Sequence, residues 1–317
     1  MQKMKSRLSM LCVMVLIIGT LAACGNGGGA GDDELRIGVV LKSLANPFYV
    51  TMAEAIEERA EELGVEVLIQ ATESEADAEG QMQIIEDMLV QQVDAILLAP
   101  NGSVELVPAV SRANEQGVPV VIITTPLDED ALYNAGAYTI SFVGSDDYYG
   151  GRVAAQEMWE ALDGSGQVAI LEGVSGHESS VARVDGFSGK LAELGGIEIV
   201  ASQPANWDQE QGYTVFQNIL QANPDVDGVF AASDLMALGA VQAIIDAGMR
   251  DQITVIGYDA SDDAKEAVRR GDMLGSIAQS PSNMGTTALE TAILFLETGS
   301  CDDWIWIDVF MVSADTL

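Results

Sequence analysis

"RIGVVLKSLANPFYVTMAEAIEERAEELGVEVLIQ", residues 36–70, contains the pattern that decides the fold. An apolar run at 37–41 leads into a segment of helical period, and a second apolar run follows at 65–70. In the middle segment, glutamates occupy one face, and the apolar residues that share the other face are Tyr49, Met52, Ile56, Ala60 and Leu63. Nearly continuous apolar runs are typical of strands covered on both faces. The stretch therefore predicts a strand–helix–strand unit of a parallel sheet.

The residues at the two ends of the middle segment predict where its helix begins and ends. Asn46 is suited to cap the amino terminus, and Pro47 fits the first turn because it lacks the backbone N–H that would be unpaired there. Gly64 is expected to end the helix, because glycine accepts the left-handed conformation found at many helix ends at little cost. The helix is thus expected directly after a polar corner that includes Lys42.

The same alternation of apolar runs and helical periods continues along the chain. The predicted strands lie at 37–41, 65–70, 95–99, 118–123, 140–144, 167–171, 197–201, 228–232, 253–257 and 274–278. Repeated strand–helix units predict an α/β fold with parallel sheets, and ten of them exceed one comfortable sheet, so we expect two domains. No Pro-rich or Ser-rich linker separates them; the nearest break in the pattern is at 131–151.

The first 23 residues are typical of a secretion signal. A basic start is followed by the apolar stretch 8–23, which is too short for a comfortable membrane span; an uncleaved anchor is the alternative. The tetrad "LAAC", residues 21–24, resembles the lipobox of bacterial lipoproteins, which implies a lipid on Cys24 and a flexible tether over 24–34. Only Cys301 then remains as a free thiol, so the mature chain contains no disulfide.

The charge is strongly acidic. The full chain has 14 basic and 49 acidic residues, and its net charge of −35 becomes −38 when the three basic residues of the signal are removed. Nucleic acid and anionic membrane surfaces repel such a chain, so neither is expected as a partner. The acidity fits either a saline exterior or simple solubility.

Enzyme chemistry finds little support in the residues. The chain has one histidine, His177, and no GxSxG, HExxH, CxxC or GxxxxGK[ST] motif. The segment "EGVSGHESS", residues 172–180, could form a glycine-rich anion cradle, but it lacks a lysine, and a polar loop histidine without a special role is the simpler interpretation. Carboxylates are too numerous for one pair to stand out. We expect no catalytic residues, no metal site and no cofactor.

Polar and aromatic residues recur where predicted strands lead into helices, which is where open α/β sheets bind ligands. These residues are Lys42, Asn46, Phe48, Tyr49, Ser233, Asp234, Tyr258, Asp259 and Gln279. Single instances have plainer explanations, since Ser233 is a good helix cap and Tyr49 fits a core. Together they suit a neutral polyhydroxylated ligand, whose hydroxyls donate and accept hydrogen bonds and whose C–H faces pack on rings such as Trp207.

In these segments the chain resembles the ribose/allose group of bacterial periplasmic sugar-binding proteins, over about residues 35–312. The segments that carry the resemblance are "VVLKSLANPFYVTM", "ILLAPNGSVELVPAVSRA", "IVASQPANWDQ", "FAASDLMALGAVQA", "VIGYDA" and "SIAQSP". It implies two Rossmann-like lobes with parallel sheets joined by a three-crossing hinge, a periplasmic binding protein fold of type I. The implied lobes are 35–144 plus 280–308 and 145–279 plus 309–317.

The resemblance also implies a set of ligand-binding residues. Positions that match the family's contacts are Lys42, Asn46, Phe48, Tyr49, Arg183, Trp207, Tyr258, Asp259 and Gln279. Two positions depart from the pattern: Thr124 stands where the sugar binders have an aspartate, and Ser233 stands where they have an asparagine. Sites built on hydrogen bonds discriminate strongly when a buried partner changes. The resemblance therefore implies a sugar or related polyol without naming it.

Taken as a whole, the resemblance implies a monomeric solute-binding lipoprotein outside the cytoplasmic membrane. It would capture the sugar or polyol between its lobes and deliver it to the membrane permease of an ABC importer. A receptor that passes a sugar or autoinducer signal to a chemoreceptor or sensor kinase is the alternative. A sugar-responsive transcription regulator would need a basic DNA-binding helix-turn-helix, and the chain begins with a signal sequence instead.

Overall fold

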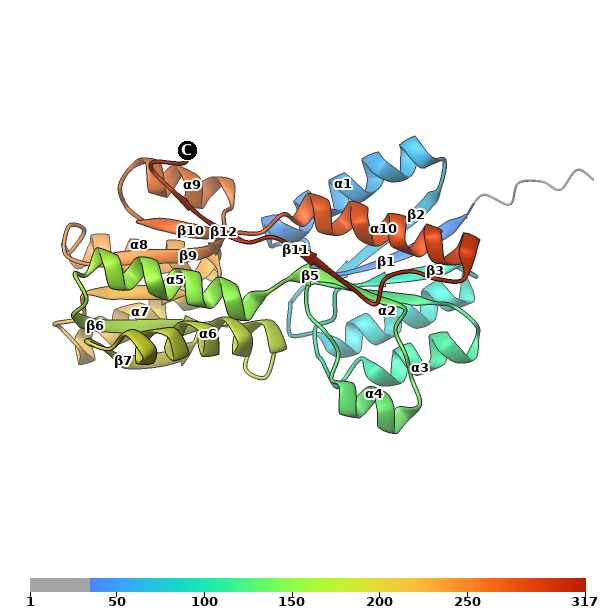
Figure 1. The fold of residues 1–317 in the computed structure, drawn as a ribbon, viewed down its shortest axis with the longest axis horizontal. Coiled ribbons are helices and arrows are strands. Elements are labelled where there is room, and N and C mark those ends of the chain that lie inside the picture. Colours follow the sequence, from blue (N-terminus) through green and yellow to red (C-terminus); the bar gives the residue numbers. More distant parts are fainter. Residues whose placement is uncertain (1–34) are drawn as a thin grey trace, which may run out of the picture. The chain divides into compact units, whose positions relative to one another are not determined.

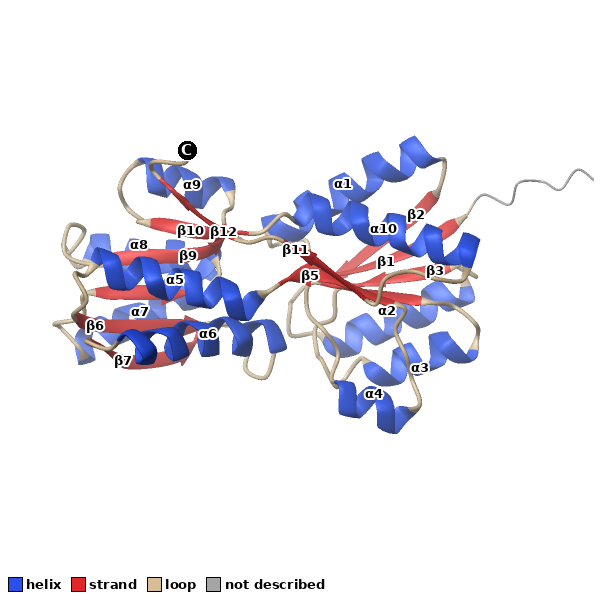
Figure 2. Ribbon diagram, in the orientation of Figure 1, coloured by secondary structure: helices blue, strands red, loops and turns tan. Residues whose placement is uncertain are grey.

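The computed structural model describes residues 35–317, and Glu34–Leu317 form one compact unit (Figure 1). The predicted signal (1–23), the predicted tether (24–34) and the predicted lipidation site, Cys24, lie outside the described residues. Helices and strands alternate along almost the whole described part, as the apolar runs predict (Figure 2).

The first sheet has six strands in the order β11-β5-β4-β3-β1-β2, all parallel. Its strands are β1 (Arg36–Ser43), β2 (Glu66–Thr72), β3 (Ala95–Leu98), β4 (Val120–Ile123), β5 (Ser141–Ser145) and β11 (Trp304–Ile307). Its helices are α1 (Pro47–Leu63), α2 (Ala78–Val90), α3 (Val107–Glu115), α4 (Glu129–Ala135) and α10 (Pro281–Thr298). Figure 1 shows α1 and α10 side by side over one face, where they share an apolar core. Helices α2 and α3 bury a second core on the other face.

The second sheet also has six strands, in the order β12-β10-β9-β8-β6-β7. Its strands are β6 (Gly166–Glu172), β7 (Ile197–Pro204), β8 (Gly228–Ala231), β9 (Thr254–Asp259), β10 (Gly275–Ala278) and β12 (Phe310–Ser313). Its helices are α5 (Asp147–Ala161), α6 (Glu178–Leu194), α7 (Gln209–Ala222), α8 (Asp234–Asp246) and α9 (Asp262–Arg269). Only β12 runs antiparallel to its neighbour among these six strands. One core lies beneath α7 and α8, and a second beneath α5 and α6.

The chain passes between the two sheets three times. It leaves β5 for α5 after Ser145, β10 for α10 between Ala278 and Pro281, and β11 for β12 between Ile307 and Phe310. The predicted fold class, two parallel-sheet lobes joined by three crossings, is confirmed. No Gly-rich linker is needed, because each crossing is a few residues between the ends of regular elements.

Helix α1 begins and ends where the sequence predicts. The Asn46 side chain accepts a hydrogen bond from the backbone N–H of Phe48 (3.0 Å), Pro47 is the first helical residue, and Gly64 has φ 67°. The predicted face is buried over three turns, but Leu63 is 40% exposed because the helix extends past the edge of the core there. Helix α1 thereby directs its first turn toward the carboxyl end of β1.

Candidate functional site

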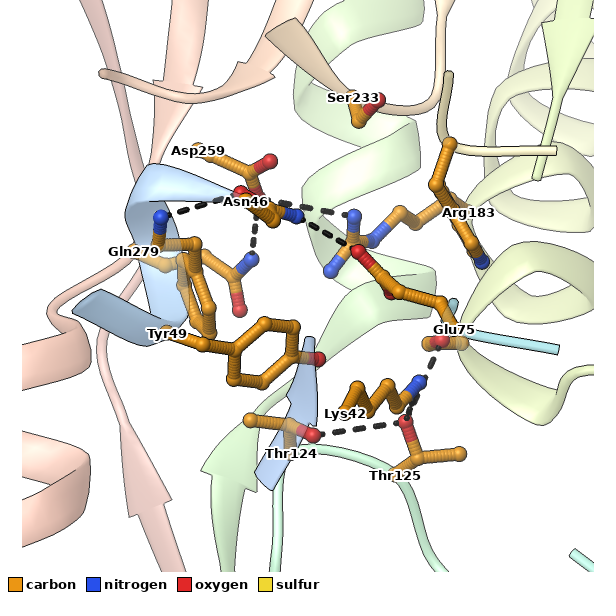
Figure 3. Close-up of a pocket in the computed structure, with 13 residues that line it drawn as sticks. Lys42, Asn46, Tyr49, Glu75, Thr124, Thr125, Arg183, Ser233, Asp259 and Gln279 are labelled. Atoms are coloured by element: carbon orange, nitrogen blue, oxygen red, sulfur yellow. Dashed lines mark hydrogen bonds and ion pairs between the residues drawn. The ribbon is translucent and has the colours of Figure 1, made fainter. Parts of the chain in front are cut away.

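A pocket lies at the carboxyl ends of the parallel strands and takes residues from both lobes. Figure 3 shows the side chains that point into it. The residues that line it are Lys42, Asn46, Phe48, Tyr49, Glu75, Thr124, Thr125, Ser179, Arg183, Trp207, Ser233, Asp259 and Gln279. Concave sites in which a few polar side chains and aromatic rings converge are typical of small-molecule binding. Open α/β sheets place ligands at this edge because loops and helix N-termini meet there.

One corner of the pocket is rich in hydrogen-bond donors. Lys42, at the end of β1, is 2% exposed, and its ammonium donates to Thr125 Oγ1 (3.1 Å). The hydroxyls of Thr124 and Thr125 lie 3.5 Å apart, and Thr125 reaches Ser179 of the second lobe at 3.4 Å. Burial lowers the pKa of Lys42, and the Glu75 carboxylate opposes that shift. An ammonium with three donors and one protein acceptor can bind further oxygens in the pocket.

The opposite corner is organised by Arg183 on α6. Its Nε donates to Asp147 Oδ1 (2.9 Å), its Nη1 donates to the carbonyl of Ala232 (2.7 Å), and its Nη1 lies 3.7 Å from Asp259 Oδ1. The guanidinium is 3.8 Å from the centre of the Tyr258 ring, within the range of a cation–π contact. Burial raises the pKa values of Asp147 and Asp259, and the Arg183 charge counters both shifts.

Two carboxylates in the pocket are each held by an amide. Asn46 Nδ2 donates to Glu75 Oε1 (2.8 Å), and Gln279 Nε2 donates to Asp259 Oδ1 (2.8 Å). Burial raises the pKa of Glu75, and the Lys42 charge is the main opposing influence. Each carboxylate retains an oxygen that can accept from a ligand hydroxyl, and so does the Gln279 carbonyl, whereas the Asn46 carbonyl already accepts from the N–H of Phe48.

Aromatic side chains form two walls. Phe48 and Tyr49 meet edge to face, with ring centres 5.1 Å apart, and burial raises the pKa of the Tyr49 hydroxyl. Trp207, in the loop between β7 and α7, is 6% exposed and packs on Gly173. A Cβ at Gly173 would lie within 3 Å of the indole, so only glycine leaves room for the ring there. Rings on two sides suit a ligand with apolar C–H faces.

The backbone is strained at the corners that carry these side chains. Seven non-glycine residues within 35–317 have positive φ, and three of them line the pocket: Thr124 (68°), Trp207 (62°) and Asp259 (113°). Such conformations cost about 1–3 kcal/mol each and are rare for a β-branched residue. At Thr124 the surrounding sheet enforces the conformation, because its N–H donates to the carbonyl of Val143 on β5 (3.0 Å).

Ten of the eleven residues predicted for ligand binding line this pocket, and Tyr258 does not. Tyr258 is fully buried beside it, where its hydroxyl donates to Asp147 Oδ1 (3.1 Å). Successive residues of a strand point to opposite faces, so Asp259 faces the pocket and Tyr258 faces the core beneath α5. Ser233 serves two roles, since it lines the pocket and also caps α8.

Sequence reasoning did not identify Glu75, Thr125 and Ser179. Glu75 lies in the acid-rich segment 73–79, where nothing in the pattern separates it from its neighbours. Thr125 was recognised only as the residue next to Thr124. Ser179 adjoins His177 in the glycine-rich turn, which indicated a possible anion cradle; in the structure the turn places a hydroxyl beside Thr125 instead.

Within residues 35–317, no group of three or more histidine, cysteine or carboxylate side chains is arranged to hold a metal ion. No helix in the same part of the chain is long and apolar enough to span a membrane.

Comparison with known proteins agrees with this arrangement. Residues 37–300 match the periplasmic binding protein domain. The chain belongs to the periplasmic binding protein family. It is 38% identical to the D-allose-binding periplasmic protein of Escherichia coli over 256 residues, 80% of this chain and 82% of that protein. It is 33% identical to the ribose import binding protein of Bacillus subtilis over 297 residues, 91% and 92% of the two chains.

A solved structure extends the match to three dimensions. An ABC transporter solute-binding protein from Actinobacillus succinogenes, crystallised with D-allose, superposes with a TM-score of 0.86 at 35% sequence identity. The alignment covers 89% of this periplasmic binding protein and 99% of the other. The similarity therefore extends over both lobes.

Proposed function

We propose that this periplasmic binding protein captures a sugar or related polyol outside the cytoplasm and delivers it to the permease of an ABC importer. The observation that carries the proposal is the pocket between the lobes, where aromatic walls and hydrogen-bonding side chains from both sheets converge. Relatives named for binding D-allose and ribose support the ligand class. On this proposal the chain carries out no covalent chemistry.

The charges of the pocket favour a neutral ligand. Two cations, Lys42 and Arg183, face three carboxylates, Glu75, Asp147 and Asp259, so opposite charges already lie close together. Binding an ionised ligand would add a charge to a buried site that is close to balance, which is costly. Ring hydroxyls instead accept from Lys42 and donate to the free carboxylate oxygens.

The preference for one sugar over another depends on the polar side chains at two positions of the pocket, Thr124 and Ser233. Thr124 and Ser233 place short hydroxyls where a charged acceptor and an amide are expected in the ribose and allose binders. Both residues are buried, at 8% and 2% exposure, so no water compensates a mismatched ligand hydroxyl. A lost buried partner is worth orders of magnitude in selectivity. We therefore propose a preferred polyol whose hydroxyl pattern differs from those of ribose and allose.

The lobes are proposed to comprise 35–144 plus 280–308 and 145–279 plus 309–317, and to close on the ligand by bending at the three crossings. A direct contact between lobes at the pocket, such as that from Thr125 to Ser179, exists only in a closed arrangement. We propose that the closed monomer is the form presented to the permease. Loss of solute uptake on deleting the gene would support import, whereas intact uptake with lost chemotaxis would indicate the sensory role.

Anchoring by a lipid on Cys24 is a further part of the proposal. The "LAAC" tetrad and the glycine-rich segment after it support this. Metabolic labelling with a radioactive fatty acid should label the wild-type protein and fail to label the Cys24→Ser variant. Equal labelling of both proteins would rule out this anchor.

Thermal-shift screening of the purified protein against pentoses, hexoses, inositols and sugar alcohols tests the ligand class. A compound that binds only the folded state raises the melting temperature, by an amount that grows with the ratio of its concentration to its Kd. A Kd near 1 µM corresponds to about −8 kcal/mol and is expected for the preferred compound. If amino acids or organic acids shift the melting temperature while no polyol does, the proposed ligand class is wrong.

A further inference from the structure

His177 lies directly behind the Trp207 wall of the pocket. It occupies the position just before α6, in the turn that also carries Gly173 and Ser179, and it is 5% exposed. Its side chain makes no hydrogen bond that caps α6, although it is in the capping position. The only histidine of the sequence is thus buried with its two ring nitrogens available for other partners.

One partner is the aromatic wall itself. The indole Nε1 of Trp207 lies 3.3 Å from His177 Nδ1, with the ring centres 6.5 Å apart. An indole N–H can only donate, so Nδ1 of His177 must be the acceptor and must carry no proton. In a neutral imidazole the proton then lies on Nε2.

The other partner belongs to the first lobe. The backbone of Asn101, in the loop after β3, faces the His177 ring and favours its protonated form. The N–H of Asn101 already donates to Gln81 Oε1 (2.7 Å), which leaves its carbonyl as the acceptor. The Asn101 side chain in turn donates to Thr72 Oγ1 (2.9 Å) and to the carbonyl of Ser74 (3.1 Å), and so fixes the loop that carries Glu75.

We propose that His177 is a positioning residue: as the neutral Nε2–H tautomer it orients the Trp207 indole toward the ligand and contacts the first lobe through Asn101 when the lobes close. The proposal rests on the proposed sugar-binding function only in stating that the Trp207 indole faces a ligand. The hydrogen bond between His177 and Trp207 lies within the second lobe and does not require a ligand. A protonated imidazole would place two N–H groups against each other and break it.

The electrostatic surroundings favour the neutral ring. Burial lowers the pKa of His177 to about 4, and the positive charge of Lys42 on β1 acts in the same direction. Trp207 and Asn101, which face its two nitrogens, are uncharged, and the backbone of Asn101 opposes the shift. Proton loss from the ring is therefore complete well above pH 4, and Nδ1 is free to accept from Trp207.

Long-range ¹H–¹⁵N NMR of the ligand-free protein tests the proposal, because the sequence contains one histidine and four tryptophans. At pH 7 we expect the Nε2–H tautomer, and on acid titration we expect the His177 ring and the Trp207 indole N–H to shift together with a midpoint near pH 4. His177→Phe should move the Trp207 resonance, and His177→Gln, which keeps an acceptor, should move it less. A Trp207→Phe variant assigns the resonance.

Trp159 provides the internal control. Its indole Nε1 donates to the carbonyl of Gly195 (2.9 Å) in the same lobe, away from the pocket, so its resonance should stay in place in every His177 variant. An Nδ1–H tautomer, a midpoint near the unperturbed value of about 6.5, or an unmoved Trp207 resonance in His177→Phe would overturn the proposal. If that variant does not fold, the tautomer and titration of the wild type decide. A thermal-shift screen in which no polyol binds would not affect these NMR results and would count against the proposed function alone.

Discussion

Replacing Arg183 with methionine removes the charge that organises one corner of the pocket and keeps much of the side-chain volume. In the wild type the Arg183 side chain is 8% exposed and pairs with Asp147, which is equally buried, while Asp259 lies 3.7 Å away. The variant leaves two buried carboxylates without their cation and the carbonyl of Ala232 without its donor. Breaking a buried ion pair from one side costs about 3–5 kcal/mol.

A loss of about 4 kcal/mol corresponds to a melting temperature lower by about 7 °C for a unit of this size, from about 2 cal/mol/K of unfolding entropy per residue. Calorimetric or circular-dichroism melting of the ligand-free protein measures it. The matched control is Arg59→Met, which also removes an arginine that contacts two glutamates, but at a site where the Arg59 side chain is 34% exposed. Exposed pairs are screened by water and contribute little, so Arg59→Met should melt close to the wild type.

The pH dependence of stability provides a second test of the Arg183→Met prediction. Burial raises the pKa values of Asp147 and Asp259, and without Arg183 they rise further. When the pKa of a carboxyl group is higher in the folded state than in the unfolded state, the free energy of unfolding decreases as the pH rises. The variant should therefore be most destabilised near pH 7.5 and least near pH 4. Adding Asp147→Asn should recover part of the loss at neutral pH. Equal melting of the Arg183 and Arg59 variants at pH 7.5 would refute the reasoning.

Three further predictions concern binding, backbone space and pH. Trp207→Ala and Asp259→Ala should each weaken binding of the best compound of the sugar screen by roughly tenfold or more, about 1.4 kcal/mol, and unchanged calorimetric affinities would remove both from the site. On α6, Gly189→Ala meets only a hydroxyl at 3.6 Å and should stabilise the protein by about 0.5–1 kcal/mol, whereas Gly186→Ala meets a backbone carbonyl of α5 and should destabilise it; equal melting temperatures would contradict this. His177 has a folded pKa of about 4, below its unfolded value, so its contribution is present above about pH 6.5 and is lost as the pH falls toward 4. The stability of the wild type relative to His177→Asn should therefore decrease by up to about 3 kcal/mol over that window in urea titrations, and a constant difference would contradict it.

The sequence predicted the strands of the sheet interiors well because burial on both faces leaves continuous apolar runs. The run at 253–257, for example, became β9, which the structure extends to Asp259. The apolar runs did not include β11 or β12, and only the resemblance assigned residues 309–317 to the second lobe. Both lie at the edges of their sheets, and in β11 exposed Trp304 and Trp306 alternate with half-buried residues, so no continuous run marks the strand.

Some residues of the site could not be predicted from the sequence, for a different reason. Helix caps such as Asn46 follow local rules and could be located from the chain alone. Glu75 could not, because its carboxylate differs from those of Glu73 and Asp77 only in the partners that folding brings to it, Asn46 and the field of Lys42. Tyr258 illustrates the opposite case: it lies next to Asp259 in the chain, but strand alternation turns its ring into the core, and it does not line the pocket.

The strained corners explain why the site side chains stay in place before any ligand arrives. A threonine at φ 68° or an aspartate at φ 113° would relax if its neighbours allowed it, and each makes a hydrogen bond with a residue from another part of its surroundings. The carbonyl of Val143 accepts from the backbone of Thr124, and Gln279 donates to the Asp259 carboxylate. The conformational cost is therefore met by folding the lobes, not by binding, and a polyol that enters finds its hydrogen-bond partners already oriented. Lobe closure then has to supply only the contacts that cross between the sheets, such as Thr125 to Ser179.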